Sequence, residues 1–253
     1  SIQDQKNCVK KIFLFDDYSK DSTLSIAEKY NVKINKAKQH LGSASKNFFR
    51  SINDIEMSDF DYFCFSDQDD IWKNDRVSNA IKFLEESKSS GYSSAVEAFW
   101  KDGKTSILKQ SKSNKEFDYL FEGAGQGCTF VMTRNLFKEV KFFCEREEEL
   151  LSNFHYHDWF VYLVSRCIGM RWYFDMEPSI MYRQHSNNDT GAKNSISGIV
   201  RRMTLIMNGW YKDQISIAFT LADVIISDPT KRKKFKKIQN IFFSNSYFIR
   251  RIK

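Results

Sequence analysis

The sequence predicts an α/β protein up to about residue 193, followed by a helical C-terminal part. Short apolar runs of strand length alternate with longer segments of helical periodicity from residue 11 onward. Acidic clusters follow the first and third strands, at the strand ends where an open α/β sheet holds its ligands. With 253 residues and 42% hydrophobic content, the chain can also build a sizeable core.

The composition excludes several other classes. Two prolines, ten glycines and 28% charged residues argue against long disordered tracts, and no segment repeats at a fixed period. Five cysteines, with no C-x-x-C pair among them, indicate neither a disulfide framework nor a cysteine zinc site and favour a reducing cytoplasm. The longest apolar stretches are interrupted by Arg166 and Asp223, so no membrane-spanning segment is predicted.

The first half is predicted to run β-α-β-α-β. Apolar runs predict a first strand ending at Phe15 and further strands at residues 32–35 and 62–65. The segments between them predict two helices, at residues 21–30 and 43–57. Asp21 or Ser22 is the expected N-cap of the first helix.

The second half predicts a mixed sheet and then a wholly helical tail. Its expected elements are a helix at residues 74–87, strands at 93–100 and 128–133, helices at 135–151 and from His157, and strands at 171–176 and 179–185. Residues 197–249 are expected to be helical, with a break at Asp228 and Pro229. We therefore expect one domain at residues 1–193 and an extension at 194–253.

The two acidic clusters are the first candidates for chemistry. Asp16 and Asp17 end the first strand, and Asp67, Asp69 and Asp70 follow the third, so the fold is expected to bring them together. The first pair alone could be a solvated turn that caps a helix. The second cluster contains an Asp-x-Asp pair, which offers hard oxygen ligands that suit Mg²⁺ or Mn²⁺.

Other acidic motifs fail on spacing. A calcium EF-hand loop starting at Asp67 would need Asp or Asn and then Gly where this chain has Ile71 and Trp72. A dehalogenase-like phosphatase needs two aspartates separated by one residue, whereas Asp16 and Asp17 are adjacent. No glycine-rich phosphate loop is present in the sequence.

Four stretches together resemble one known family. They are "FLFDDYSKDST", "FCFSDQDDIW", "GCTFVMTR" and "HDWFVYLVSRCIGMRWYFDMEPSIMYRQHSNNDTGA", in this order and spacing. The combination is similar to family 2 inverting glycosyltransferases of the GT-A fold, a Rossmann-like fold with a mixed sheet flanked by helices, and above all to rhamnosyltransferase-like members. The resemblance covers roughly residues 1–193.

The resemblance implies a role for each of nine residues. It implies nucleotide-base binding by Asp16 and Asp17, a place near the nucleotide for Lys46 and Asn47, ribose binding by Asp67, Mn²⁺ or Mg²⁺ binding by Asp69 and His185, general base catalysis by Asp158, and a place near the diphosphate for Arg183. Two departures accompany it. The family's first nucleotide-binding strand is expected to be missing before residue 1, and Tyr18 stands where the family usually has glycine.

The expected activity is metal-dependent transfer, with inversion, of a sugar from a UDP- or dTDP-sugar donor. The expected acceptor is a surface glycan, such as a capsule or lipopolysaccharide intermediate, which can be lipid-linked. A metal-dependent sugar-nucleotide hydrolase or phosphoesterase is an alternative. A truncated, non-catalytic scaffold for other transferases is another.

The tail carries the basic charge. Residues 194–253 contain twelve Lys or Arg against three Asp or Glu, which leaves the first 193 residues near −2 of a total of +7. Basic and apolar residues at helical spacing around 231–243 suit a helix lying on an anionic membrane, so a cytoplasmic protein on the inner face of the membrane is expected. The alternative is a helix packed on the catalytic domain. No recognition motif supports nucleic-acid binding.

Overall fold

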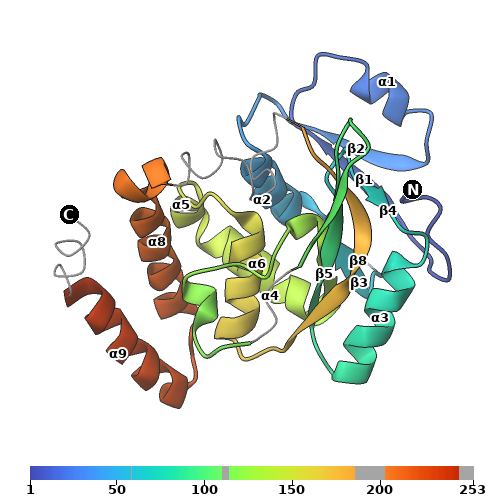
Figure 1. Cartoon of the computed structure of the whole chain (residues 1–253). Coiled ribbons are helices and arrows are strands. Elements are labelled where there is room, and N and C mark those ends of the chain that lie inside the picture. The colour runs from blue at the N-terminus through green and yellow to red at the C-terminus, as the bar shows by residue number, and fades with distance from the viewer. Residues whose placement is uncertain (58, 110–113, 186–202, 245–253) are drawn as a thin grey trace.

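A six-stranded mixed sheet forms the centre of the computed structural model (Figure 1), which describes residues 1–57, 59–109, 114–185 and 203–244. The strands follow the order β3 (Tyr62–Cys64), β7 (Val131–Thr133), β5 (Gly91–Phe99), β8 (Trp172–Arg183) and β4 (Ile71–Trp72), with β6 (Thr105–Leu108) paired to β5. The pair β5 and β8 is parallel, whereas the other pairs in this sheet are antiparallel. The mixed sheet predicted for the second half is confirmed.

The first two strands form a separate sheet. Strand β1 (Ile12–Asp16) runs parallel to β2 (Val32–Lys36), with the short helix α1 (Thr23–Ala27) between them in the chain. Strand β3 was expected to follow them within one open sheet, but it pairs with β7 instead. Among the described residues, β1 therefore has β2 as its only strand partner, and its first four side chains stay partly exposed.

Helices cover both faces of the larger sheet (Figure 1). Helices α2 (Ala44–Asp54), α4 (Arg134–Arg146) and α6 (His157–Cys167) pack together on one face, and α3 (Arg76–Ser87) packs on the other. The side chains of Ser43 and Thr133 cap α2 and α4 by accepting backbone N–H groups of the first turn. The charged helix predicted at 135–151 divides into α4 and α5 (Glu148–Leu151).

Strand β8 corrects a prediction of two strands. The sequence indicated strands at 171–176 and 179–185, because Pro178 interrupts the apolar pattern. The structure joins them into one strand with a bulge, where Asp175 and Pro178 pair with the consecutive residues Ser94 and Ala95 of β5. A bulge accommodates proline because the displaced residue need not donate a ladder hydrogen bond.

The strand predicted at residues 128–133 begins later than expected. Residues Gly127–Thr129 form the 3-10 turn η2, and β7 occupies only the last three positions. A second 3-10 turn, η1 (Asp118–Leu120), precedes it. The segment before β7 can therefore approach the start of α6 instead of continuing the sheet.

The C-terminal helices share the main core. Helix α8 (Trp210–Ile225) packs on α6, and α9 (Pro229–Ser244) packs on α8 (Figure 1). Phe219 and Phe235 are fully buried within the same hydrophobic cluster as the residues of α6. The predicted boundary near residue 193 lies outside the described residues, as do residues 245–253. Within the described chain, no helix combines the length and the apolar character that a membrane crossing requires.

Candidate active site

The pair of aspartates at the end of β1 is held in place by backbone groups. Asp16 is buried, and its carboxylate accepts the N–H of Ser19 at 3.1 Å. Asp17 accepts the N–H of Leu41 at 2.7 Å, and its other oxygen lies 2.9 Å from Nδ1 of His40. The loop after β2 is thereby tied to the carboxyl end of β1.

The first turn of α2 is tied to the same strand end. Asn47 donates from its side-chain amide to the carbonyl of Phe15 at 2.7 Å. Arg50 donates to Oδ1 of Asn47 at 2.8 Å and to the carbonyl of Asp16 at 3.0 Å. The amide of Asn47 is thus engaged with the protein backbone, whereas Lys46 is exposed beside it.

The predicted metal ligands lie together. Nε2 of His185 is 2.8 Å from Oδ2 of Asp69, although 116 positions separate the two residues in the chain. Arg183 donates from Nε to the carbonyl of Asp69 at 3.0 Å and from its backbone N–H to Oδ1 of Asp70 at 3.1 Å. Strand β8 therefore delivers a guanidinium and an imidazole to the acidic segment that follows β3.

A second group of ligand atoms lies further inside. The carboxylates of Asp67 and Asp70 and the thiol of Cys128 are all within 4.8 Å of one another. Burial, followed by the charges of Asp70 and Asp69, raises the pKa of Asp67 to about 7. Asp67 is thus held close to the balance between its protonated and ionised forms at neutral pH.

Arg76, which the sequence analysis missed, is a buried cation beside this group. It is 1% exposed, donates from Nη2 to the carbonyl of Cys128 at 2.7 Å, and stacks its guanidinium 3.7 Å from the ring centre of Trp72. Burial raises the pKa of Asp70, and the charge of Arg76 is one of the smaller effects that oppose this rise. A signal was available, because Arg76, Ala80 and Leu84 recur every fourth residue on the buried face of α3.

The predicted base lies at the start of α6. Asp158 is in the first turn, where backbone N–H groups favour negative charge. Its Oδ1 accepts the N–H of Trp159 at 2.7 Å. The backbone N–H groups of Trp159 and Gly127 stabilise the charged form of the carboxylate. Burial nevertheless raises the pKa of Asp158 to about 6.

Three rings join the segments that carry these residues. Phe48 stacks on His157 with 4.0 Å between ring centres and a 12° angle between the planes. Phe65 lies against both, 5.2 Å from Phe48 and 5.5 Å from His157. Phe48 follows Asn47, His157 precedes Asp158, and Phe65 lies two positions before Asp67. This aromatic trio therefore connects the three parts of the site.

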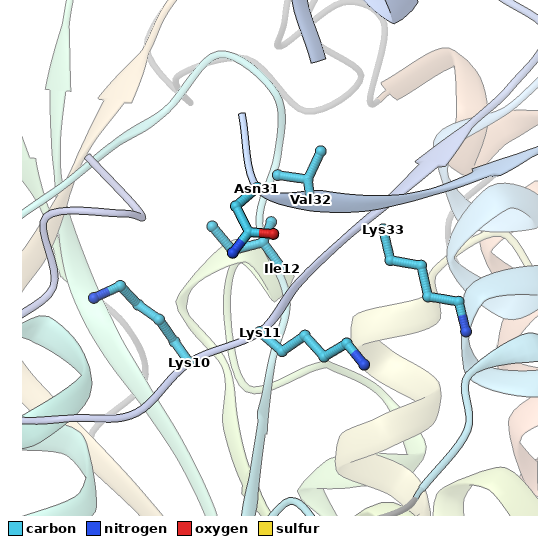
Figure 2. Close-up of a pocket in the computed structure, with 6 residues that line it drawn as sticks. All are labelled: Lys10, Lys11, Ile12, Asn31, Val32 and Lys33. Carbon is cyan, nitrogen blue, oxygen red and sulfur yellow. The ribbon is translucent and has the colours of Figure 1, made fainter. Parts of the chain in front are cut away.

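One pocket lies elsewhere. Figure 2 shows a pocket of about 440 Å³ at the amino ends of β1 and β2, lined by Lys10, Lys11, Ile12, Asn31, Val32 and Lys33. Asp16 lies at the opposite end of β1. None of the nine residues predicted for the site lines this pocket.

A mixed sheet flanked by helices, with acidic residues beyond two strand ends, is the architecture of the GT-A fold. The S. aureus TarS 1-349 crystal structures in complex with UDP-GlcNAc and with UDP have TM-scores of 0.56 and 0.53 and identities of 18% and 17%. Each match covers 97% of this chain, which spans 67% and 66% of those structures.

Sequence relatives narrow the class. Residues 1–141 match the profile of a family described as "Glycosyl transferase family 2". The dTDP-rhamnosyl transferase RfbG of Shigella flexneri is 39% identical over an alignment of 230 residues, which covers 88% of this chain and 80% of that protein. The chain belongs to glycosyl transferase family 2 and is a rhamnosyltransferase-like member of it.

Proposed function

We propose that this chain transfers a sugar, with inversion, from a nucleotide-diphosphate donor to a glycan acceptor, and that the donor is a dTDP-rhamnose. The observation that carries the proposal is the placement of Asp158, a carboxylate with a raised pKa, next to the segment that bears Asp67, Asp69 and Asp70. The 39% identity to a dTDP-rhamnosyl transferase favours this donor over a UDP-sugar.

The described residues have the chemistry that the reaction needs. Asp158 would accept the proton of the acceptor hydroxyl as that oxygen attacks the anomeric carbon, a contribution typically worth about 10²- to 10⁴-fold in rate. Arg183 and His185 stand beside Asp69, where they could face the charge of the leaving diphosphate. At the end of β1, the partly exposed Asp17 would offer its carboxylate to the nucleotide, while the buried Asp16 holds the following turn through Ser19.

The residues around Asp69 also fit a divalent cation. Asp69 offers a carboxylate oxygen, and His185 offers an imidazole nitrogen 2.8 Å from it. Asp67 and Asp70 are on the same segment, where their carboxylates lie within 4.8 Å of each other and of the Cys128 thiol. This oxygen-rich donor set suits Mg²⁺ or Mn²⁺. When bound, the cation would offset the negative charge that develops on the leaving diphosphate.

The donor is tested with the purified chain and radiolabelled donors. We expect label transfer from dTDP-rhamnose, but not from UDP-GlcNAc, to a lipid-linked glycan extract in Mn²⁺ and loss of transfer in EDTA. Proton NMR of the product should show the inverted anomeric configuration. Release of free sugar without transfer would support the hydrolase alternative, and no binding of any donor by calorimetry would support the scaffold.

Asp69→Asn tests the cation site. The substitution removes one anionic ligand from a site that has few of them. We expect calorimetry to show at least about tenfold weaker binding of dTDP-rhamnose in Mn²⁺, and unchanged binding in EDTA. Asp102→Asn, in an exposed turn, is the matched control. Equal affinity of Asp69→Asn and the unaltered chain in Mn²⁺ would contradict the assignment.

We also propose that an anionic membrane surface is a partner of α9. Lys233, Lys237 and Ile241 are exposed and follow one another at four-residue spacing, so they share one side of the helix. Basic and apolar side chains in this arrangement suit the boundary of lipid headgroups. Such a location would bring the enzyme to lipid-linked acceptors on the cytoplasmic face of the membrane.

A further inference from the structure

Gly127 packs against the start of α6 more closely than any side chain would allow. A Cβ atom at this position would lie 2.6 Å from Nε2 of His157 and 3.1 Å from Cβ of Asp158. Favourable contacts between carbon atoms lie at about 3.5–4.0 Å. The backbone N–H of the same glycine also stabilises the charged form of the Asp158 carboxylate. The position of the candidate base therefore depends on the absence of a side chain at Gly127.

Two aromatic rings restrict the movement of the His157 ring. One of its faces stacks on Phe48, and Phe65 meets it edge to face at an interplanar angle of 70°. Phe65 is buried in the main core, and Phe48 packs against that core. Burial lowers the pKa of His157 to about 3, so the imidazole is neutral and acts through its shape.

The next residue reaches the donor side of the site. The thiol of Cys128 lies with the carboxylates of Asp67 and Asp70, and its carbonyl accepts a hydrogen bond from Arg76. Two consecutive residues of η2 thus contact the base and the acidic segment. A shift at Gly127 would therefore change the distance between Asp158 and the carboxylates of Asp67 and Asp70.

We propose that Gly127 and His157 are positioning residues that hold Asp158 at a fixed place relative to the donor-side carboxylates. Neither needs to touch the substrate. This inference rests on the proposed sugar transfer with Asp158 as base, and it adds the device that places that base. Misplacement of a reacting group by about 1 Å can cost about 10²-fold in rate, so the effect is measurable.

The first test is Gly127→Ala with dTDP-rhamnose. We expect kcat to fall by about 10²-fold while the KM for the donor stays within about twofold, because a positioning defect acts in the transition state. Ser106→Ala, at an exposed position of β6, is the control because the substitution only shortens a side chain at the protein surface. A raised donor KM with unchanged kcat in Gly127→Ala would overturn the proposal.

The second test removes the ring that the new methyl group would strike. His157→Ala alone should lower kcat by about tenfold, because the aromatic trio loses its third member. If the two substitutions acted independently, their fold-losses in kcat would multiply in the Gly127→Ala/His157→Ala double variant. We expect the kcat of the double variant to be about tenfold higher than this product predicts, because the clash is gone. A kcat equal to the product would contradict a steric link between the two residues. If Gly127→Ala does not fold, the kcat and KM of His157→Ala decide.

A crystal structure of Gly127→Ala gives an answer that does not depend on turnover. The proposal requires the His157 ring and the Asp158 carboxylate to be displaced from their places in the unaltered chain. If both stay in place, the positioning role is wrong. If they move, yet the unaltered chain transfers no sugar from any donor, the proposed function fails and the steric link stands.

Discussion

The aspartate side chains of this site lie in different environments. Asp69 is paired with an imidazole, Asp67 is half-buried among like charges, and Asp158 is half-buried at the start of a helix. Differences of this kind separate acid, base and ligand roles among chemically identical groups. The raised pKa of Asp158 makes it a stronger proton acceptor than an exposed aspartate, at the cost of being protonated in mild acid.

Asp158→Asn should leave donor binding nearly unchanged and lower kcat by about 10²-fold or more, because the base acts in the transition state. For the unaltered enzyme, the pKa of about 6 predicts that activity falls as pH drops through 6, since the carboxylate is then protonated. Steady-state rates between pH 5 and pH 8 test both expectations. An acid limb near pH 4 would show that the carboxyl behaves as an exposed one.

Tyr18 holds a backbone conformation that suits glycine. Its φ is +65°, and its side chain is 51% exposed, so no burial compensates the strain of about 1–2 kcal/mol. The exposed ring lies next to Asp17 in the chain, so the prediction is that it contacts the bound donor. We expect Tyr18→Gly to keep the free energy of unfolding within about 1 kcal/mol and to raise the KM for dTDP-rhamnose severalfold. An unchanged KM would mean that the Tyr18 ring does not contact the donor.

The sequence predicted which segments carry the candidate site better than it predicted the contacts between them. The Asp-x-Asp spacing pointed to residues 67–69, and the family resemblance pointed to His185, which the fold places against Asp69. The local sequence pattern could not show that the side-chain amide of Asn47 donates to the carbonyl of Phe15, or that the thiol of Cys128 lies beside Asp67 and Asp70. Such contacts depend on pairings between distant segments, which a single sequence does not encode locally.

At the scale of elements, the long periodic segments were predictable and the short strands were not. Helices α3 and α6 match their predicted positions, because each repeats an apolar face over several turns. Strands β4 and β6, with two and four residues, were missed. Their pairing partners β8 and β5 define them, and no periodicity develops over so few positions.

Helix α9 shows how tertiary packing decides between two readings of one pattern. Its Lys234 and Lys236 pair with Glu116 and Asp223 on the rest of the protein, at 2.8 Å and 2.7 Å. Phe235 between them is fully buried and lies 5.8 Å from the ring of Phe219. Part of the basic-apolar pattern therefore serves to attach the helix to α8.

Phe235→Ala should lower the free energy of unfolding by about 3–5 kcal/mol, since it empties a closed part of the main core. Ile241→Ala, on the same helix but 60% exposed, is the matched control and should change it by less than about 0.5 kcal/mol. Urea denaturation measures both. Equal, small effects would mean that α9 contributes little to the core.

At the scale of the whole molecule, charge is segregated. The residues from 194 onward carry a surplus of nine basic groups over acidic ones, and the rest of the chain is close to neutral. The ion pairs of α9 neutralise some of this charge, which leaves the exposed side with Lys233 and Lys237. A field of this kind attracts anionic surfaces over about one Debye length.

Sedimentation with anionic liposomes tests this surface. The chain should pellet with phosphatidylserine vesicles at low salt and be released as salt rises, because each near-surface charge contributes only about 1 kcal/mol. Lys233→Glu/Lys237→Glu should stay in solution, whereas Lys82→Glu, on the remote helix α3, should still pellet. Removal of α9 is a poor control, since it would uncover the buried ring of Phe219. Identical behaviour of all variants would exclude the helix as an anchor.

The aromatic trio has a consequence for how this enzyme can change. Phe48, Phe65 and His157 belong to three segments with different tasks, yet each ring contacts the other two. Residues in direct contact show coupling energies of about 0.5–3 kcal/mol when altered together. Substitutions in this trio should therefore be epistatic, and a change selected for a new donor would carry a penalty at the base. New specificity is more accessible through exposed residues such as Tyr18 and Lys46, which can vary one at a time.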